Sequence, residues 1–275
     1  MERKPIQMLG PFIVLIFVMA CSLSGGESTQ IPEATTVPEN TVQVEVTDEP
    51  VEPTASTENT PVIEIGSCAN PYYPVREGST WNYMSTSTVV PGYSFTDTIT
   101  NVRDGGYTLT SKFDSLTRTQ EWACTPEGLV ALQMGGGLSM TGTNLKVETQ
   151  SASGVTYPAE MNAGDTWQYK LDFTGKMDIA GQSGDSTGST QSSFTALGSE
   201  SVTVPAGTFD AMKVQTITTF NANVSFQGVT VPVTFTSTTI SWYAEGVGWV
   251  KSESAGDFAG QAFTETIELQ WYNIP

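Results

Sequence analysis

The sequence contains no histidine, and this absence removes several classes of chemistry. Serine and cysteine hydrolases that rely on a histidine base are excluded, as are zinc and haem sites with histidine ligands. Cysteine is scarce, and three residues are too few for a cysteine-only zinc site or an iron–sulfur cluster. The run Gly135–Gly137 lacks the Lys-Ser or Lys-Thr of a phosphate-binding loop and indicates a hairpin turn. We therefore predict no cofactor and no metal.

Basic residues are also few, since 11 Lys and Arg stand against 29 Asp and Glu, for a net charge of -18. A chain without a basic patch cannot exchange its charges for the counterions of phosphates, which excludes nucleic acid as a partner. The same deficit argues against electrostatic adhesion to anionic lipid.

One apolar run of signal-peptide length occurs, over residues 11–20, behind Arg3 and Lys4. It is too short to span a bilayer comfortably as a permanent helix. Val18-Met19-Ala20-Cys21 resembles a bacterial lipobox, in which the cysteine receives a diacylglycerol and becomes the mature N-terminus. The resemblance implies a lipoprotein signal peptide over residues 1–20 and a membrane anchor on Cys21. An ordinary secretory signal is the alternative.

Residues 21–65 have no pattern that would form a core. The stretch 22–65 holds nine acidic residues and no Lys or Arg, and it is rich in Thr, Pro, Ser and Val. Such a composition buries too little apolar surface to offset its ordering entropy. We predict a disordered acidic stalk; a segment that binds cations or a basic partner is the alternative.

Residues 66–275 have the composition of a folded domain, and this part is long enough to form one hydrophobic core. Nine basic residues face nineteen acidic ones in this part, which leaves it at a net charge near -10. With Cys21 assigned to lipid, Cys68 and Cys124 form an even pair in an exported domain, and a disulfide is the expected result. Two buried free thiols are the alternative.

The hydrophobic pattern of this domain indicates strands throughout and no amphipathic helix. Bulky and polar residues alternate with period two over 167–173, and Arg103–Gly106 carries the signal of a hairpin turn. The last predicted strand, Phe263–Trp271, has an apolar face interrupted by Glu265. About a dozen antiparallel strands must curl or close to protect their edges. We predict an all-β fold with an antiparallel curved sheet, as a half-barrel or a sandwich.

Two motifs occur twice in the same order. Gly-x-Thr-Trp-x-Tyr is found at 78–83 and 164–169, and Trp122–Val130 aligns with Trp242–Val250. The repetition predicts two duplicated halves, about 66–150 and 151–275, with Gly181–Gln191 as part of an insertion in the second. Chance and a shared β-composition are the alternative.

Three segments resemble signatures of uncharacterised bacterial β-rich exported proteins. They are Ser201–Val214, Trp242–Lys251, and Tyr157-Pro158 through Tyr169. The resemblance implies an antiparallel, curved or barrel-like sheet, broadly similar to periplasmic lipoprotein-carrier folds. It implies no activity and no catalytic residue.

Carboxylates and tryptophans are the remaining candidates for a site. Two carboxylates could flank a sugar bond, but no spacing places any pair at the required separation, and we interpret them as solvated strand ends. The carboxylates are Glu121, Glu127, Asp165, Glu245 and Glu265. Tryptophans could stack on a sugar or line an apolar cavity, but core packing is favoured, with Trp249 and Trp271 as the expected exposed pair. The others are Trp81, Trp122, Trp167 and Trp242.

The sequence therefore predicts a membrane-tethered extracytoplasmic lipoprotein with a non-enzymatic β-domain. By analogy of fold, that domain would bind an apolar or amphiphilic ligand. The alternative is a structural or protein-interaction module of the cell envelope without a ligand pocket. The identity of ligand-binding residues stays open.

The anchor can be tested with Cys21→Ser. Because the thiol is the point of lipid attachment, the substitution is expected to block lipidation and move the protein from the membrane fraction to the soluble fraction. Cell fractionation measures this, and a variant that stays in the membrane fraction would show that lipidation is not the anchor.

Overall fold

The computed structural model describes residues 68–88, 91–114, 116–133, 138–140, 143–179, 182–258 and 261–275. Cys21, the predicted stalk and Gly135–Gly137 lie outside these residues. The described residues form strands, turns and loops without a helix, so none of them could cross a membrane as a helix.

The strands follow one another with short connections. They are β1 Thr80–Ser87, β2 Tyr93–Arg103, β3 Gly106–Phe113, β4 Thr117–Thr125, β5 Gly128–Ala131, β6 Leu138–Met140, β7 Thr143–Gly154, β8 Tyr157–Pro158, β9 Thr166–Ile179, β10 Gln182–Val204, β11 Gly207–Phe226, β12 Val229–Ala244, β13 Gly248–Phe258 and β14 Gln261–Asn273.

These strands belong to one antiparallel sheet. Its hydrogen-bonded order is β3-β2-β1-β14-β13-β12-β11-β10-β9-β7-β6-β4-β5-β8, and β3 also pairs with β4. Strand β4 meets β6 through the pair Thr117 and Ser139. The order therefore leads back to its start, and the prediction of an all-β, curved antiparallel sheet is confirmed.

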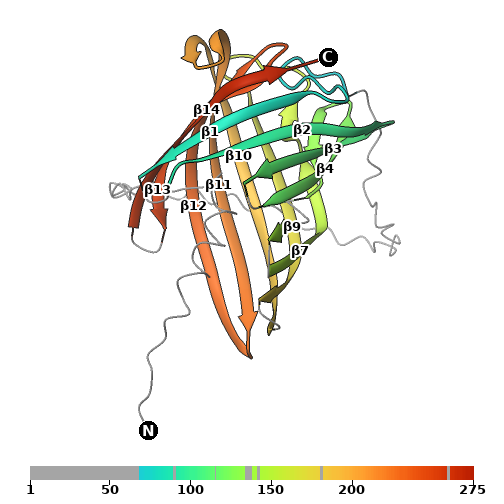
Figure 1. Cartoon of the computed structure of the whole chain (residues 1–275), viewed down its shortest axis with the longest axis vertical. Coiled ribbons are helices and arrows are strands. Elements are labelled where there is room, and N and C mark those ends of the chain that lie inside the picture. Colours follow the sequence, from blue (N-terminus) through green and yellow to red (C-terminus); the bar gives the residue numbers. More distant parts are fainter. Residues whose placement is uncertain are drawn as a thin grey trace, which may run out of the picture. The chain divides into compact units, whose positions relative to one another are not determined.

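Strand length divides this sheet into two parts. Strands β10 and β11 have 23 and 20 residues, whereas β1 and β3 have 8 each. At about 3.3 Å per residue, β10 is about 75 Å long and β3 about 26 Å. Figure 1 shows β14 and β1–β4 crossing the long strands β9–β12, which continue well beyond β4. We call the face of β9–β12 that packs toward β1–β4 the inner face.

The core lies between these two groups of strands. Ile99 of β2, Tyr107 of β3 and Leu171 of β9 have no exposed surface and belong to one hydrophobic cluster. Full burial of such side chains contributes roughly 1.5–3 kcal/mol each, so this contact is a main source of stability.

Tyr73 ties several strands together at one end of the core. It precedes β1, and its ring stacks on Trp81, Tyr107, Trp122 and Tyr157 at centroid distances of 5.5, 6.2, 6.1 and 4.9 Å. These rings come from β1, β3, β4 and β8. Aromatic pairs in such offset geometry add to the stability that burial alone gives. A segment without regular structure thus supplies the centre of the aromatic core.

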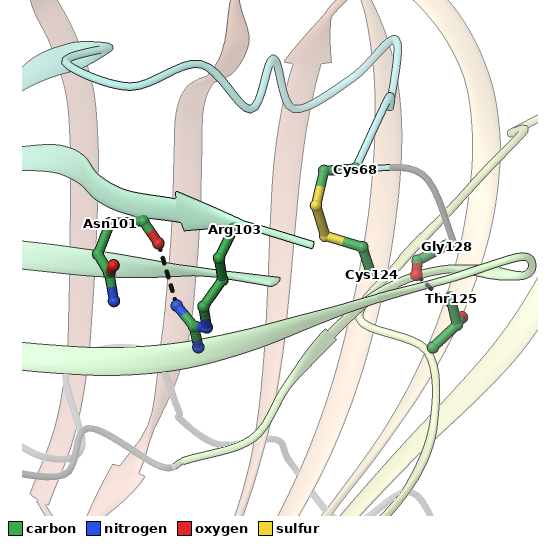
Figure 2. The surroundings of a disulfide bond; sticks show 6 residues. All are labelled: Cys68, Asn101, Arg103, Cys124, Thr125 and Gly128. Atoms are coloured by element: carbon green, nitrogen blue, oxygen red, sulfur yellow. Dashed lines mark hydrogen bonds between the residues drawn. A yellow bond between two sulfur atoms is a disulfide. The ribbon is translucent and has the colours of Figure 1, made fainter. Parts of the chain in front are cut away.

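The segment that carries Tyr73 is fastened by the predicted disulfide. Cys68 and Cys124 are bonded, with their Cα atoms 4.9 Å apart, and Figure 2 shows the bond joining the segment before β1 to the end of β4. Nearby, Thr125 donates a hydrogen bond to the carbonyl of Gly128 across the β4–β5 turn. Arg103 donates to the carbonyl of Asn101, a residue with φ of 52° at an irregularity of β2.

The structure also bears on the predicted hairpin, the predicted insertion and the predicted boundary between the two halves. The hairpin around Arg103–Gly106 is present, as β2 and β3. Gly181–Gln191 was expected in an insertion; residues 182–191 form the first part of β10 and pair with β9, and residues 184–191 also pair with β11. The boundary proposed between the halves, at 150/151, falls inside β7.

The duplicated motifs occupy equivalent local structures. Gly78 and Gly164 both have positive φ, 81° and 92°, two residues before β1 and β9 begin. A glycine is favoured there because side chains with a Cβ rarely adopt this conformation. Trp122 and Trp242 each precede a hairpin turn that ends at Gly128 or Gly248. The duplication itself stays a prediction.

Loss of the disulfide should destabilise the fold. The bond closes a loop with a sequence separation of 56. The chain-entropy model gives a loss of about 4 kcal/mol in the free energy of unfolding for the double variant Cys68→Ala/Cys124→Ala. Urea unfolding followed by tryptophan fluorescence measures it. An unchanged midpoint would mean that the bond does not constrain the unfolded chain.

Candidate functional site

The inner face of β9–β12 changes character along its length. Side chains on one face of a strand recur every second residue, and register places facing residues of neighbouring strands side by side. On β12 this series starts with Val229 and Val231, which are 63% and 53% exposed, and reaches Ser237, which is 1% exposed. The face therefore runs from open and apolar to buried and polar.

Three stacked phenylalanines mark the start of the buried part. Phe173 of β9, Phe220 of β11 and Phe235 of β12 have ring centroids 5.7 and 4.9 Å apart. Gly188 of β10 lies under them, and a Cβ there would come within 2.7 Å of the Phe173 ring. This glycine therefore allows the rings to pass over β10, and we call the three rings the phenylalanine ladder.

Beyond the ladder, the strand ends carry an apolar surface. Register pairs Ala222 with Val233, Val224 with Val231, and Phe226 with Val229. These six residues are named the distal face. The opposite side of the same hairpin is polar, with bonds between Ser225 and Thr230 and from Thr234 to Asn221. The hairpin is therefore amphipathic, and its apolar side is the continuation of the inner face.

On the other side of the ladder, small hydroxyls line the inner face and the interior sides of β13 and β1. This hydroxyl belt consists of Ser85, Thr190, Ser192, Thr218, Ser237, Ser241, Ser252 and Ser254, all buried. Ser192 and Thr218 bond at 2.8 Å, and Ser254 bonds to the neighbouring Thr239 at 3.0 Å. A β-sheet core is normally filled with valine and isoleucine at such positions, so a row of hydroxyls is a departure from simple packing.

Glu265 of β14 lies within this belt. It is 4% exposed and faces Ser254 in the register of β13 and β14. Ser85 and Tyr93 both donate to its Oε1, at 2.6 and 3.0 Å. A buried carboxylate is costly unless it is hydrogen-bonded, and these hydroxyls supply the bonds. The interruption that Glu265 makes in the apolar pattern of β14 is thus an inward-facing polar site.

A second buried polar group lies on β2, β3 and β4. Asp97 is 7% exposed, and Ser111 forms a hydrogen bond with its carboxyl group. Arg118 donates from Nη2 to Ser111 Oγ at 3.2 Å. Burial raises the pKa of Asp97 above its ordinary value, although the Arg118 guanidinium and the Ser111 bond act in the opposite direction. Asp97 also raises the pKa of Tyr83, after the larger effect of burial on that phenol.

The carboxylates considered from the sequence are not gathered into one cleft. Glu121 pairs with Arg103, and Asp165 accepts the backbone N–H of Asn162 in the turn before β9. Glu127 and Glu245 lie in the turns after β4 and β12. Of the five, only Glu265 is buried. Within the described residues, no group of three or more His, Cys, Asp or Glu is arranged to hold a metal ion.

The tryptophans mostly serve the core. Trp81, Trp122 and Trp242 are buried. Trp271 is exposed as predicted, at 49%, but Trp249 is only half-buried, because its ring packs on Tyr83 at 4.5 Å. The expectation that Trp249 and Trp271 form an exposed pair was therefore wrong for Trp249.

Two of the three signature segments meet on the face of β11–β13 opposite to Ser241 and Ser252, since side chains alternate along a strand. Lys213, Trp242 and Lys251 lie in register on β11, β12 and β13, and both ammonium groups lie over the indole, at 5.3 and 5.4 Å. The indole N–H donates to Glu200 at 2.7 Å, and this bond, with the nearby Lys213, lowers the pKa of Glu200. Cation–π and charge contacts thus link the motifs, which gives them an architectural role.

Sequence reasoning missed Asp97, Arg118 and the hydroxyl belt. The belt has a signal in the sequence, since Thr190-x-Ser192, Ser237-x-Thr239-x-Ser241 and Ser252-x-Ser254 repeat hydroxyls with period two. That pattern resembles a solvated strand face, and only the cross-strand register shows that it faces inward. Asp97 has no such pattern.

Together, these observations define an all-β protein with an amphipathic inner face. Residues 127–257 match the model of a family described as DUF3108-like. This range contains all three signature segments, which confirms the resemblance predicted from them.

Solved structures also match, at low similarity. An exported protein, so described, of Bacteroides fragilis with a YmcC-like fold shares 15% identity over 75% of this chain and 100% of its own, with a TM-score of 0.44. A protein of Parabacteroides distasonis described as a lipoprotein shares 17% identity over 76% of this chain and 100% of its own, with a TM-score of 0.37. The hypothetical lipoprotein YmcC from Escherichia coli shares 10% identity over 72% of this chain and 85% of its own, with a TM-score of 0.34. No curated protein matches the chain.

The raised pKa of Asp97 predicts a pH-dependent effect of Asp97→Asn. The folded chain holds the carboxyl proton of Asp97 more tightly than the unfolded chain does, because its pKa is raised on folding. As the pH rises above the ordinary pKa of 3.8, ionisation of Asp97 therefore lowers the free energy of unfolding of the parent protein. The stability of the variant relative to the parent should therefore increase between about pH 4 and neutral pH. Urea unfolding at both pH values measures this. A constant difference would contradict a raised pKa.

Proposed function

We propose that this chain is an exported, lipid-anchored envelope protein whose β-domain binds an amphiphilic ligand without transforming it. The Val18–Cys21 motif supports export and attachment to a membrane. A Cys68–Cys124 disulfide suits an oxidising compartment outside the cytoplasm. The acidic domain has no need of a basic surface to stay at the membrane if a lipid on Cys21 holds it there.

The observation that carries the binding proposal is the gradient along the inner face of β11 and β12. Val229 and Val231 are more than half exposed, and Thr218 and Ser237 on the same face are buried. An apolar surface that stays open to water costs free energy, about 25 cal/mol per Å2, and its burial by an acyl chain recovers that cost. From Val229 to Phe235 the face extends about 20 Å along the strand.

A polar group of the same ligand would meet the hydroxyl belt. Ser and Thr hydroxyls each combine a donor with two acceptor lone pairs, so the belt can exchange internal bonds for bonds to a ligand. An amphiphile fits both ends of the gradient at once, whereas a wholly apolar or wholly polar molecule would fit one. This complementarity favours an amphiphile as the ligand.

A protein-interaction module is the second candidate. Trp271 and Tyr272 are adjacent, partly exposed aromatics at the end of β14, and aromatic residues of this kind are enriched in interfaces. This surface is separate in sequence from the distal face, so the two functions can be tested with different variants.

Ligand binding can be tested by native mass spectrometry of the full chain purified from bacterial membranes. We expect a bound lipid in addition to the one on Cys21. Val231→Asp should reduce its occupancy at least severalfold, because a charge on the distal face opposes contact with an acyl chain. Val102→Asp is the matched control, since Val102 is also exposed but lies at the end of β2. Absence of bound lipid from repeated preparations would favour the interaction module.

A further inference from the structure

The buried group on β2, β3 and β4 contains more hydrogen-bonding capacity than it uses. Ser111 links Asp97 and Arg118, since it bonds to the carboxyl group of one and accepts from Nη2 of the other. Within the described residues, Oδ1 of Asp97 and Nε of Arg118 are nevertheless buried and have no hydrogen-bond partner. Natural proteins rarely leave such atoms unpaired, so each one calls for an explanation.

The surroundings of these atoms are aromatic and continuous with the inner face. Asp97 lies in β2 between Phe95 and Ile99, both buried in the main cluster, and its charge acts on Tyr73 and Tyr83. Asp97 pairs with Trp81 of β1, and Trp81 lies on the same buried face of β1 as Ser85 of the hydroxyl belt, because side chains alternate along a strand. The polar group therefore faces the same interior as the hydroxyl belt.

Oδ1 of Asp97 and Nε of Arg118 can both be paired by one kind of ligand group. An ionised Oδ1 needs a donor, and a protonated carboxyl can offer its own O–H, while the Nε–H of Arg118 needs an acceptor. A hydroxyl meets every one of these needs, because it donates and accepts. An ionised Asp97 would repel a phosphate or carboxylate in a domain that already has a net charge near -10, and an ammonium cannot accept from Arg118.

We propose that Asp97, Ser111 and Arg118 form a subsite for a hydroxyl of the ligand's head group, so that the protein selects amphiphiles with an uncharged polyol head. This inference rests on the proposed function and names the class of its ligand. Asp97 and Arg118 are then specificity-determining residues.

Titration calorimetry with three amphiphiles of one chain length tests the proposal. Monocaprin has a glycerol head, decanoate a carboxylate and decylphosphocholine a zwitterion without a free hydroxyl. The full chain should bind monocaprin at least tenfold more tightly than the other two. Asp97→Asn and Arg118→Lys should each weaken monocaprin binding by roughly tenfold, the size expected for one hydrogen bond to a charged group. Neither should weaken the binding of decylphosphocholine, and Asp97→Asn should strengthen the binding of decanoate, because it removes the carboxylate that repels the decanoate head.

Asp104→Asn is the matched control, because it makes the same chemical change in the exposed β2–β3 turn. Arg118→Lys keeps the positive charge but lacks the Nε–H, so it gives an independent result if Asp97→Asn fails to fold. Equal binding of the three amphiphiles, or unchanged monocaprin affinity in both variants, would overturn the subsite and leave the proposed function intact. If none of the amphiphiles binds, the proposed function fails with it.

Discussion

The structure depends on a mismatch in strand length between two parts of one sheet. Strands β1 and β3 are about a third as long as β10, so they cover only part of the inner face of β9–β12. Where cover exists, Ile99, Tyr107 and Leu171 form a close-packed core. Where it ends, the same alternation of side chains leaves Val229 and Val231 of the distal face exposed. The amphipathic inner face is a consequence of this geometry.

The covered part is held in place by a segment without regular structure. Tyr73 inserts among rings from four strands, and the Cys68–Cys124 disulfide fixes the segment that carries it. Elsewhere, Lys213 and Lys251 flank Trp242 and join β11, β12 and β13. Packing, a covalent bond and charge therefore fix the frame, and the hydroxyl belt and Asp97 are polar exceptions within it.

Much of the fold could be predicted, because alternation, glycine turns and the absence of helical periodicity act locally. The β2–β3 hairpin and the inward series of Phe263, Ile267 and Leu269 follow from such signals. The site could not be predicted, because it depends on register between distant strands. Glu265 accepts a hydrogen bond from Ser85, which lies 180 residues away in the sequence. Ser192 is buried by other strands, and its own sequence neighbours do not distinguish it from a solvated serine. The Gly/Ser-rich stretch 184–191 carries no local signal of its pairing with strands on both sides.

The position of a bound amphiphile is the central claim, and paramagnetic NMR tests it most directly. With valine methyl groups labelled, a monoacylglycerol that carries a spin label on its acyl chain should broaden Val224 and Val231 on the distal face. Val202 and Val204, at the opposite end of β10, should keep their line widths. Broadening of all four alike, or of Val202 and Val204 alone, would contradict the account.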